Sequence, residues 1–223
     1  MLLFICYGFV ATLAIFYGLV YRHSLVVTFV AFHLFVCLGI PMIHGWREGR
    51  LQDIWQRVWR TGRGKHAKGL WVGFSSGILL FAAVLIGTRL LLTAGIDGLL
   101  IRQTLMSWGL SSRFIWLFAG YITIVNSLLE EWFWRGFVLE RLSVSMPPER
   151  SIPLTSLFFS IYHLILGVCL FGWAWGIAIT CLVFAVGAFW GWLGLRYQSI
   201  YASWFSHMLA DLGLMTALVR WIF

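Results

Sequence analysis

The sequence predicts an all-α membrane protein, a polytopic bundle of about seven transmembrane helices with one or two amphipathic helices in the membrane interface. Of its 223 residues, 61% are hydrophobic and 11% are charged, whereas ordinary soluble domains contain about 25% charged residues. Apolar stretches of about 20 residues, long enough to cross a bilayer core, recur along the chain. This composition excludes a soluble globular enzyme, a disordered chain and a nucleic-acid-binding protein.

The apolar stretches also suggest how the chain is organised. The predicted spans lie at 2–21, 25–43, 69–88, 114–137, 154–173, 174–195 and 199–219. We interpret the first as a retained helix and not as a secretory signal, because no basic residue precedes Arg22 and a second span follows at once. We expect one integrated membrane domain, in which residues 1–113 supply N-terminal helices and residues 114–223 form a catalytic helical core.

Two segments between the spans are amphipathic. Residues 44–68 combine basic side chains with apolar residues at helical spacing, which predicts a helix lying in the interface. Basic loops favour the cytoplasmic side, so we expect this loop, the N-terminus and the loop 138–153 to be cytoplasmic. Residues 89–113 then face outside and form a second interfacial helix.

The cysteines give no sign of a disulfide or metal site. They lie inside apolar runs, without C-x-x-C spacing, at Cys6, Cys37, Cys169 and Cys181. This pattern is typical of small buried apolar side chains. We expect no cofactor and no bound metal.

Polar side chains concentrate in three of the predicted spans. An ionisable group at mid-membrane costs about 2.5–3.5 kcal/mol, so each one needs a reason to be there. The polar residues are Asn126, Glu130, Glu131 and Arg135 in the fourth span, Ser156, Ser160 and His163 in the fifth, and Ser199, Ser203, Ser206, His207 and Asp211 in the seventh. Since such stripes are cheapest to bury facing one another, we expect these helices to enclose a wet cavity. His33, alone in the second span, is interpreted as a packed, hydrogen-bonded residue.

Helical spacing separates the roles of the acidic residues. Glu131 and Arg135 are four residues apart and can pair on one face, which keeps Glu131 ionised. Glu130 shares another face with Asn126 and is the better general base for a water molecule. The two histidines of the fifth and seventh spans can orient that water or donate to a developing oxyanion. This set suits amide hydrolysis without a covalent intermediate.

These residues resemble the signatures of the intramembrane glutamic protease family known as CPBP or ABI, which includes the type II CAAX prenyl endopeptidases. The EExxxR motif stands here as EEWFWR, Glu130–Arg135, and the FxxxH motif as FSIYH, Phe159–His163. The third motif, HxxxN or a close variant, stands as HMLAD, His207–Asp211. The resemblance covers residues 120–215.

The resemblance implies a helical-bundle protease whose site opens to the cytoplasmic side. It implies that Glu130 and His163 activate the attacking water, and that His207 and the residue at 211 stabilise the oxyanion. The supporting residues are Glu131, Arg135, Phe159 and Asn126.

The departure from the family pattern is Asp211, where the prenyl endopeptidases typically have Asn. An ionised Asp would repel an oxyanion, so Asp211 is either protonated or accepts a hydrogen bond from His207 and fixes its tautomer. We favour the second, because the two residues are four apart on a helix. The departure leaves open whether the substrate is prenylated.

The leading hypothesis is an endopeptidase of the prokaryotic inner membrane. It would hydrolyse a membrane-associated peptide or protein at the cytoplasmic side, with the lipid bilayer as its other partner and no nucleic acid. Three alternatives stay open: a proton- or ion-coupled transporter, a zinc-dependent membrane metallohydrolase, and a catalytically silent family member. The sequence leaves the oligomeric state undetermined.

Overall fold

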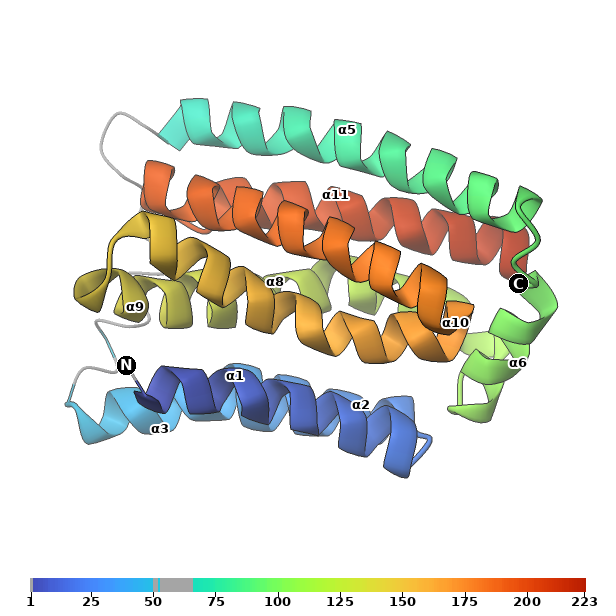
Figure 1. Cartoon of the computed structure of the whole chain (residues 1–223), viewed down its shortest axis with the longest axis horizontal. Coiled ribbons are helices and arrows are strands. Elements are labelled where there is room, and N and C mark those ends of the chain that lie inside the picture. The colour runs from blue at the N-terminus through green and yellow to red at the C-terminus, as the bar shows by residue number, and fades with distance from the viewer. Residues whose placement is uncertain (1, 50–51, 53–65) are drawn as a thin grey trace.

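The computed structural model describes residues 2–49, 52 and 66–223. Within these ranges the chain forms helices and no strands, so the predicted all-α polytopic membrane bundle is confirmed (Figure 1). The α-helices are α1 (Leu2–Ile15), α2 (Leu25–Phe29), α3 (Ile40–Arg47), α5 (His66–Thr93), α6 (Gly98–Ser107), α7 (Ile115–Gly120), α8 (Ser127–Glu131), α9 (Glu140–Ser145), α10 (Pro148–Tyr197) and α11 (Tyr201–Ala217). They are joined or extended by the π-helical segments η1 (Phe16–Tyr21), η2 (Val30–Gly39), η4 (Tyr121–Asn126), η5 (Trp132–Leu139) and η6 (Leu218–Ile222), and by the 3₁₀ turn η3 (Ser112–Phe114).

Five helical stretches of the described chain are long and apolar enough to cross a membrane, where the sequence predicts about seven spans. They are Leu3–Tyr21, Leu25–Arg47, Ala67–Thr93, Ser112–Ser145 and Pro148–Tyr197. The counts differ for two reasons. α10 holds two of the predicted spans, which a bend at Gly172 separates, and α11 has 17 residues and carries His207 and Asp211.

α10 is a hairpin of two antiparallel arms, residues 148–171 and 173–197 (Figure 1). The chain reverses at Gly172, whose φ of 79° and ψ of 175° are not helical. Glycine adopts a positive φ without the steric cost that a Cβ imposes. Near the bend the arms touch, since a Cβ on Gly167 would lie 3.0 Å from the Cα of Gly176. The first arm carries His163, and the second arm packs behind it.

The helices lie in layers (Figure 1). α5 and α11 run side by side on one edge, α1 to α3 lie on the opposite edge, and α8, α9 and α10 fill the middle. α5 and α11 approach closely at Gly77, where an added Cβ would lie 3.0 Å from the Cα of Ser206. Small residues let membrane helices approach in this way. Ser76 Oγ also donates to Ser206 Oγ at 3.1 Å, and these contacts hold the segment of α11 that carries His207.

The two predicted amphipathic segments have different outcomes. Most of 44–68 lies outside the described residues, although α3 reaches Arg47 at its start. Within 89–113, α6 begins at a cap in which Asp97 Oδ1 accepts from the backbone N–H of Leu99 at 2.8 Å. Ile101 and Leu105 are buried, whereas Leu99 is exposed, as an amphipathic helix requires. Its position in the interface stays a prediction.

The prediction that the cysteines are buried is right only for Cys37. Cys6, Cys169 and Cys181 lie exposed on helix surfaces. The outer surface of a membrane bundle faces lipid, which is as apolar as the protein interior, so a small apolar side chain gains little from burial there.

Candidate active site

The predicted acidic, basic and imidazole side chains of the fourth and seventh spans meet in the structure. Glu131, at the end of α8, accepts a hydrogen bond from Arg135 Nη1 on its Oε1 at 2.8 Å. The same oxygen lies 3.0 Å from Nδ1 of His207, which α11 supplies. Arg135 also donates from Nη2 to the backbone carbonyl of Gly187 on the second arm of α10, at 2.9 Å. The ion pair predicted from the four-residue spacing is therefore confirmed, and it is buried.

His207 lies among three carboxylates. Its Nε2 is 3.5 Å from Glu130 Oε2 and 3.6 Å from Asp211 Oδ2, on the side opposite Glu131. The ring stacks on Trp190, with centroids 4.1 Å apart and an interplanar angle of 20°. This stacking and the bond to Glu131 fix the ring so that Nε2 faces Glu130.

The predicted hydrogen bond between His207 and Asp211 is wrong. Their separation of 3.6 Å is too long for one, and Asp211 Oδ2 accepts instead from Asn126 Nδ2 at 3.3 Å. Because Glu131 is paired with Arg135, its carboxylate only accepts, so His207 Nδ1 must donate to it. Glu131 therefore sets the tautomer of His207. The four-residue spacing brings two side chains near each other, but here a neighbouring helix offers a closer partner.

His163 projects from the first arm of α10. Its Nδ1 donates to the backbone carbonyl of Phe159 at 2.7 Å, one turn earlier. A carbonyl only accepts, so the neutral ring keeps Nε2 free as an acceptor. The Phe159 ring lies 4.6 Å below the Arg135 guanidinium and 6.0 Å from His207, edge to face. Phe159 thus packs between the histidines and the ion pair, which fits its predicted supporting place.

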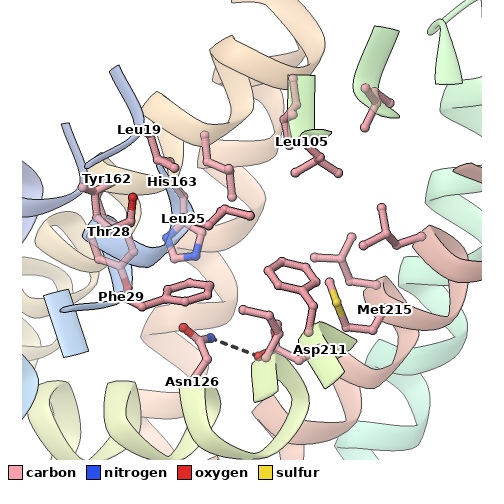
Figure 2. A pocket seen from close by; sticks show the side chains of 18 of the residues that line it. Leu19, Leu25, Thr28, Phe29, Leu105, Asn126, Tyr162, His163, Asp211 and Met215 are labelled. Atoms are coloured by element: carbon pink, nitrogen blue, oxygen red, sulfur yellow. Dashed lines mark hydrogen bonds between the residues drawn. The ribbon is translucent and has the colours of Figure 1, made fainter. Parts of the chain in front are cut away.

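A cavity of about 220 Å³ opens beside these groups (Figure 2). Its carboxyl, imidazole and amide lining side chains are His33, Asn126, Glu130, His163 and Asp211, and most of its other lining residues are apolar. The predicted convergence of three helices is therefore found for these residues. Glu131, Arg135 and His207 do not line it. The N-terminal helices, to which the sequence assigns no part in the site, contribute another wall.

Two polar residues that the sequence analysis did not assign to the site contact it. Tyr162 donates its hydroxyl hydrogen to Glu130 Oε1 at 3.0 Å. The sequence could have indicated this contact, because Tyr162 stands next to His163 in the FSIYH motif. His33, expected to be packed and hydrogen-bonded, is both, but it also lines the cavity and contacts Asn126 at 3.0 Å. A single histidine on an apolar helix carries no spacing that would place it there.

The predicted serine stripe of the fifth span does not face the cavity. Ser156 and Ser160 are buried, and their hydroxyls donate to the carbonyls of Ile152 and Leu157 in the same helix. A serine in a helix can satisfy its hydroxyl on the preceding turn, so it does not need a wet surface. As for metal ligands, no three His, Cys, Asp or Glu side chains within the described ranges are placed to hold an ion.

A comparison with protein families finds a match in the second half of the chain. Residues 112–213 match the family model described as type II CAAX prenyl endopeptidase Rce1-like. The matched segment contains all three motifs and ends after Asp211, whereas His33 lies outside it. Comparisons with curated proteins and with solved structures found no match.

Proposed function

We propose that this chain is an intramembrane endopeptidase of the glutamic type, because residues 112–213 match the model of the Rce1-like type II CAAX prenyl endopeptidases, a family of membrane endopeptidases. It hydrolyses a peptide bond of a membrane-associated peptide or protein. The observation that carries the proposal is that Glu130 and His163 line one cavity, while Glu130 Oε2 has no hydrogen-bond partner among the described residues and the bond from His163 Nδ1 leaves Nε2 as an acceptor.

The first step is water activation. Glu130 Oε1 is held by Tyr162, while its Oε2 has no hydrogen-bond partner among the described residues. His163 offers Nε2, because its Nδ1 is occupied by Phe159. A water that donates one hydrogen to each acceptor keeps a lone pair directed away from both. Glu130 then takes a proton as the water oxygen attacks the carbonyl carbon.

The second step is collapse of the tetrahedral intermediate. Glu130 returns the proton to the leaving nitrogen as the C–N bond breaks, so atoms and charges balance without a covalent enzyme intermediate. Glu131 and Arg135 support the site through His207, whose Nε2 faces the catalytic oxygen of Glu130. Precise placement of such groups contributes to catalysis because the reacting atoms need little reorganisation.

The substrate must present a peptide bond together with apolar groups. The cavity has polar lining side chains, among them Glu130 and His163. The rest of its lining is mostly apolar, and the N-terminal helices supply part of it. The family is named for endopeptidases of prenylated CAAX proteins, in which a lipid is attached to a cysteine near the C-terminus. The excess of basic residues in 44–68 favours a cytoplasmic position for that loop. The cavity extends toward the opposite helix ends, at Leu25, Leu105 and Phe171, so cleavage at the cytoplasmic side stays a prediction from the sequence.

Cleavage of a defined peptide by the purified protein tests this function. The probes are two internally quenched peptides ending in a CAAX sequence, one farnesylated and one not, incubated with the full chain in lipid nanodiscs. We expect the wild type to cut at least one, and Glu130→Gln to lower the rate by about 10²–10⁴-fold because the general base is lost. Glu149→Gln, an exposed glutamate at the start of α10, is the matched control and should keep full activity.

Other results would contradict the proposal. Full activity of Glu130→Gln would remove the glutamic mechanism. Loss of wild-type activity on chelation, restored by zinc, would favour a metallohydrolase. Proton-coupled flux in proteoliposomes without cleavage of any peptide would favour a transporter.

A further inference from the structure

A row of hydrogen bonds connects the N-terminal helices to the candidate active site. The Tyr121 hydroxyl lies 2.7 Å from Nδ1 of His33, on η2. Nε2 of His33 lies 3.0 Å from Oδ1 of Asn126, and Nδ2 of Asn126 lies 3.3 Å from Oδ2 of Asp211. His33 is 1% exposed and lies outside the segment matched by the family.

The direction of each hydrogen bond follows from its chemistry. An Asp211 carboxylate only accepts, so the amide group of Asn126 must present its nitrogen to it. The amide oxygen then faces His33 and only accepts, which places a hydrogen on His33 Nε2. The neutral ring accepts on Nδ1 from the Tyr121 hydroxyl. Asp211 and His33 therefore hold the two ends of the Asn126 amide, the nitrogen toward Asp211 and the oxygen toward His33.

The Asn126 amide nitrogen also faces the reaction space. Asn126, Asp211 and His163 project into the same cavity (Figure 2). The nitrogen carries two hydrogens, and Asp211 accepts one of them. A carboxylate at 211 cannot stabilise a developing negative charge, whereas a neutral amide donor beside it can.

We propose that Asn126 donates a hydrogen bond to the tetrahedral oxyanion and that His33 is the positioning residue that keeps its amide nitrogen turned to the cavity. Asp211 holds the amide from the other side and does not act on the substrate. The inference rests on the proposed endopeptidase function. It also gives the N-terminal helices a part in catalysis.

The first test removes the donor. Asn126→Leu is close in volume and cannot donate, so kcat on the cleaved CAAX peptide should fall by about 10²–10³-fold, the usual effect of losing one oxyanion donor. KM should change by less than about threefold, because the bond forms with the oxyanion and not with the bound substrate. Thermal melting in detergent shows whether the variant is folded.

The second test exchanges the amide and the carboxylate. Asn126→Asp alone removes the donor and places two carboxylates together, so kcat should fall at least as far as in Asn126→Leu. In the double variant Asn126→Asp/Asp211→Asn, the new carboxylate accepts from His33 and the new amide donates to it. One amide donor is restored on the cavity, and kcat should recover by about tenfold or more over Asn126→Asp.

The third test addresses His33. His33→Leu removes the bond that orients the amide, and kcat should fall by about tenfold with little change in KM. His33→Gln can still donate to Asn126 Oδ1 and should retain more activity than His33→Leu. A role in packing alone would make Leu the better substitute at this buried apolar position.

The outcomes separate this inference from the proposed function. If the wild type cuts no peptide, the proposed function fails and the inference fails with it. If the wild type cuts and Glu130→Gln does not, but a folded Asn126→Leu keeps the wild-type kcat, only the inference is overturned. If Asn126→Leu does not fold, the exchange variant decides: a folded exchange variant without recovery overturns the inference.

Discussion

Two clusters in this protein have the same composition and matching contact distances, but they lie in different surroundings. The buried cluster consists of His207, Glu131 and Arg135, and the edge cluster consists of His44, Glu48 and Arg141. In each, one glutamate oxygen lies 2.8 Å from an arginine nitrogen and 3.0 Å from a histidine nitrogen. The glutamate side chain is 0% exposed in the buried cluster and 33% exposed in the edge cluster.

The comparison shows that burial, and not geometry, decides what such a cluster does. In the edge cluster Glu48, just beyond the second membrane span, ties α3 to α9 through a two-nitrogen contact with Arg141. Water can replace any partner there, so the pair contributes little stability. In the buried cluster no water replaces a lost partner, so each member depends on the others. The His207 ring of the buried cluster also faces Glu130, which lines the cavity.

The largest contrast should be in activity. Glu131→Gln exchanges the carboxylate that orients His207 for an amide that can also donate, so kcat should fall. The upper bound is the loss of about 10⁴-fold seen when the carboxylate that orients a general-base histidine becomes an amide. The matched substitution in the edge cluster, Glu48→Gln, should keep peptide cleavage within about twofold. Steady-state cleavage of the farnesylated and plain CAAX peptides measures both. Equal losses in the two variants would show that burial does not distinguish the clusters.

The next contrast should be in stability. Arg135→Met leaves the buried Glu131 carboxylate without its cation and should lower the free energy of unfolding by about 3–5 kcal/mol. Arg141→Met should lower it by less than about 1 kcal/mol. Denaturant unfolding in mixed micelles gives both values. The double variant Glu131→Leu/Arg135→Met should be more stable than Arg135→Met alone, since it leaves no unpaired carboxylate, and the opposite order would contradict this account.

The sequence could predict the helical spans but not how they turn against one another. Apolar length predicted the helical spans, and the expected boundary between two of them, at residues 173 and 174, lies beside the bend at Gly172. Composition could not show that the chain reverses at Gly172 or that the two arms of α10 touch beside the bend. That result depends on the backbone at a single glycine and on the contact between Gly167 and Gly176.

The site shows a similar limit. The four-residue spacing predicted the Glu131–Arg135 pair, because both partners lie on one helix and the spacing fixes their distance. The sequence could not identify Glu131 as the partner of His207, nor Asn126 as the partner of Asp211. Those contacts depend on how each helix is rotated about its axis in the bundle. For the same reason, nothing in the sequence connects His33 to Asn126.

The smallest effect is the pH dependence of the edge cluster. The hydrogen bond from Arg141 is the main cause that lowers the pKa of Glu48 from 4.5 to about 2, and His44 lowers it further. A lowered folded-state pKa means that Glu48 contributes stability above pH 4.5 and loses this contribution as the pH falls toward 2. The melting temperature of the wild type should therefore exceed that of Glu48→Gln by a small margin at pH 5. The margin should shrink below pH 4.5, and it should be smaller throughout in an Arg141→Met background, because the arginine is its main source. A margin that grows on acidification would contradict the lowered pKa and, with it, the view that the edge cluster is an ordinary water-accessible ion pair.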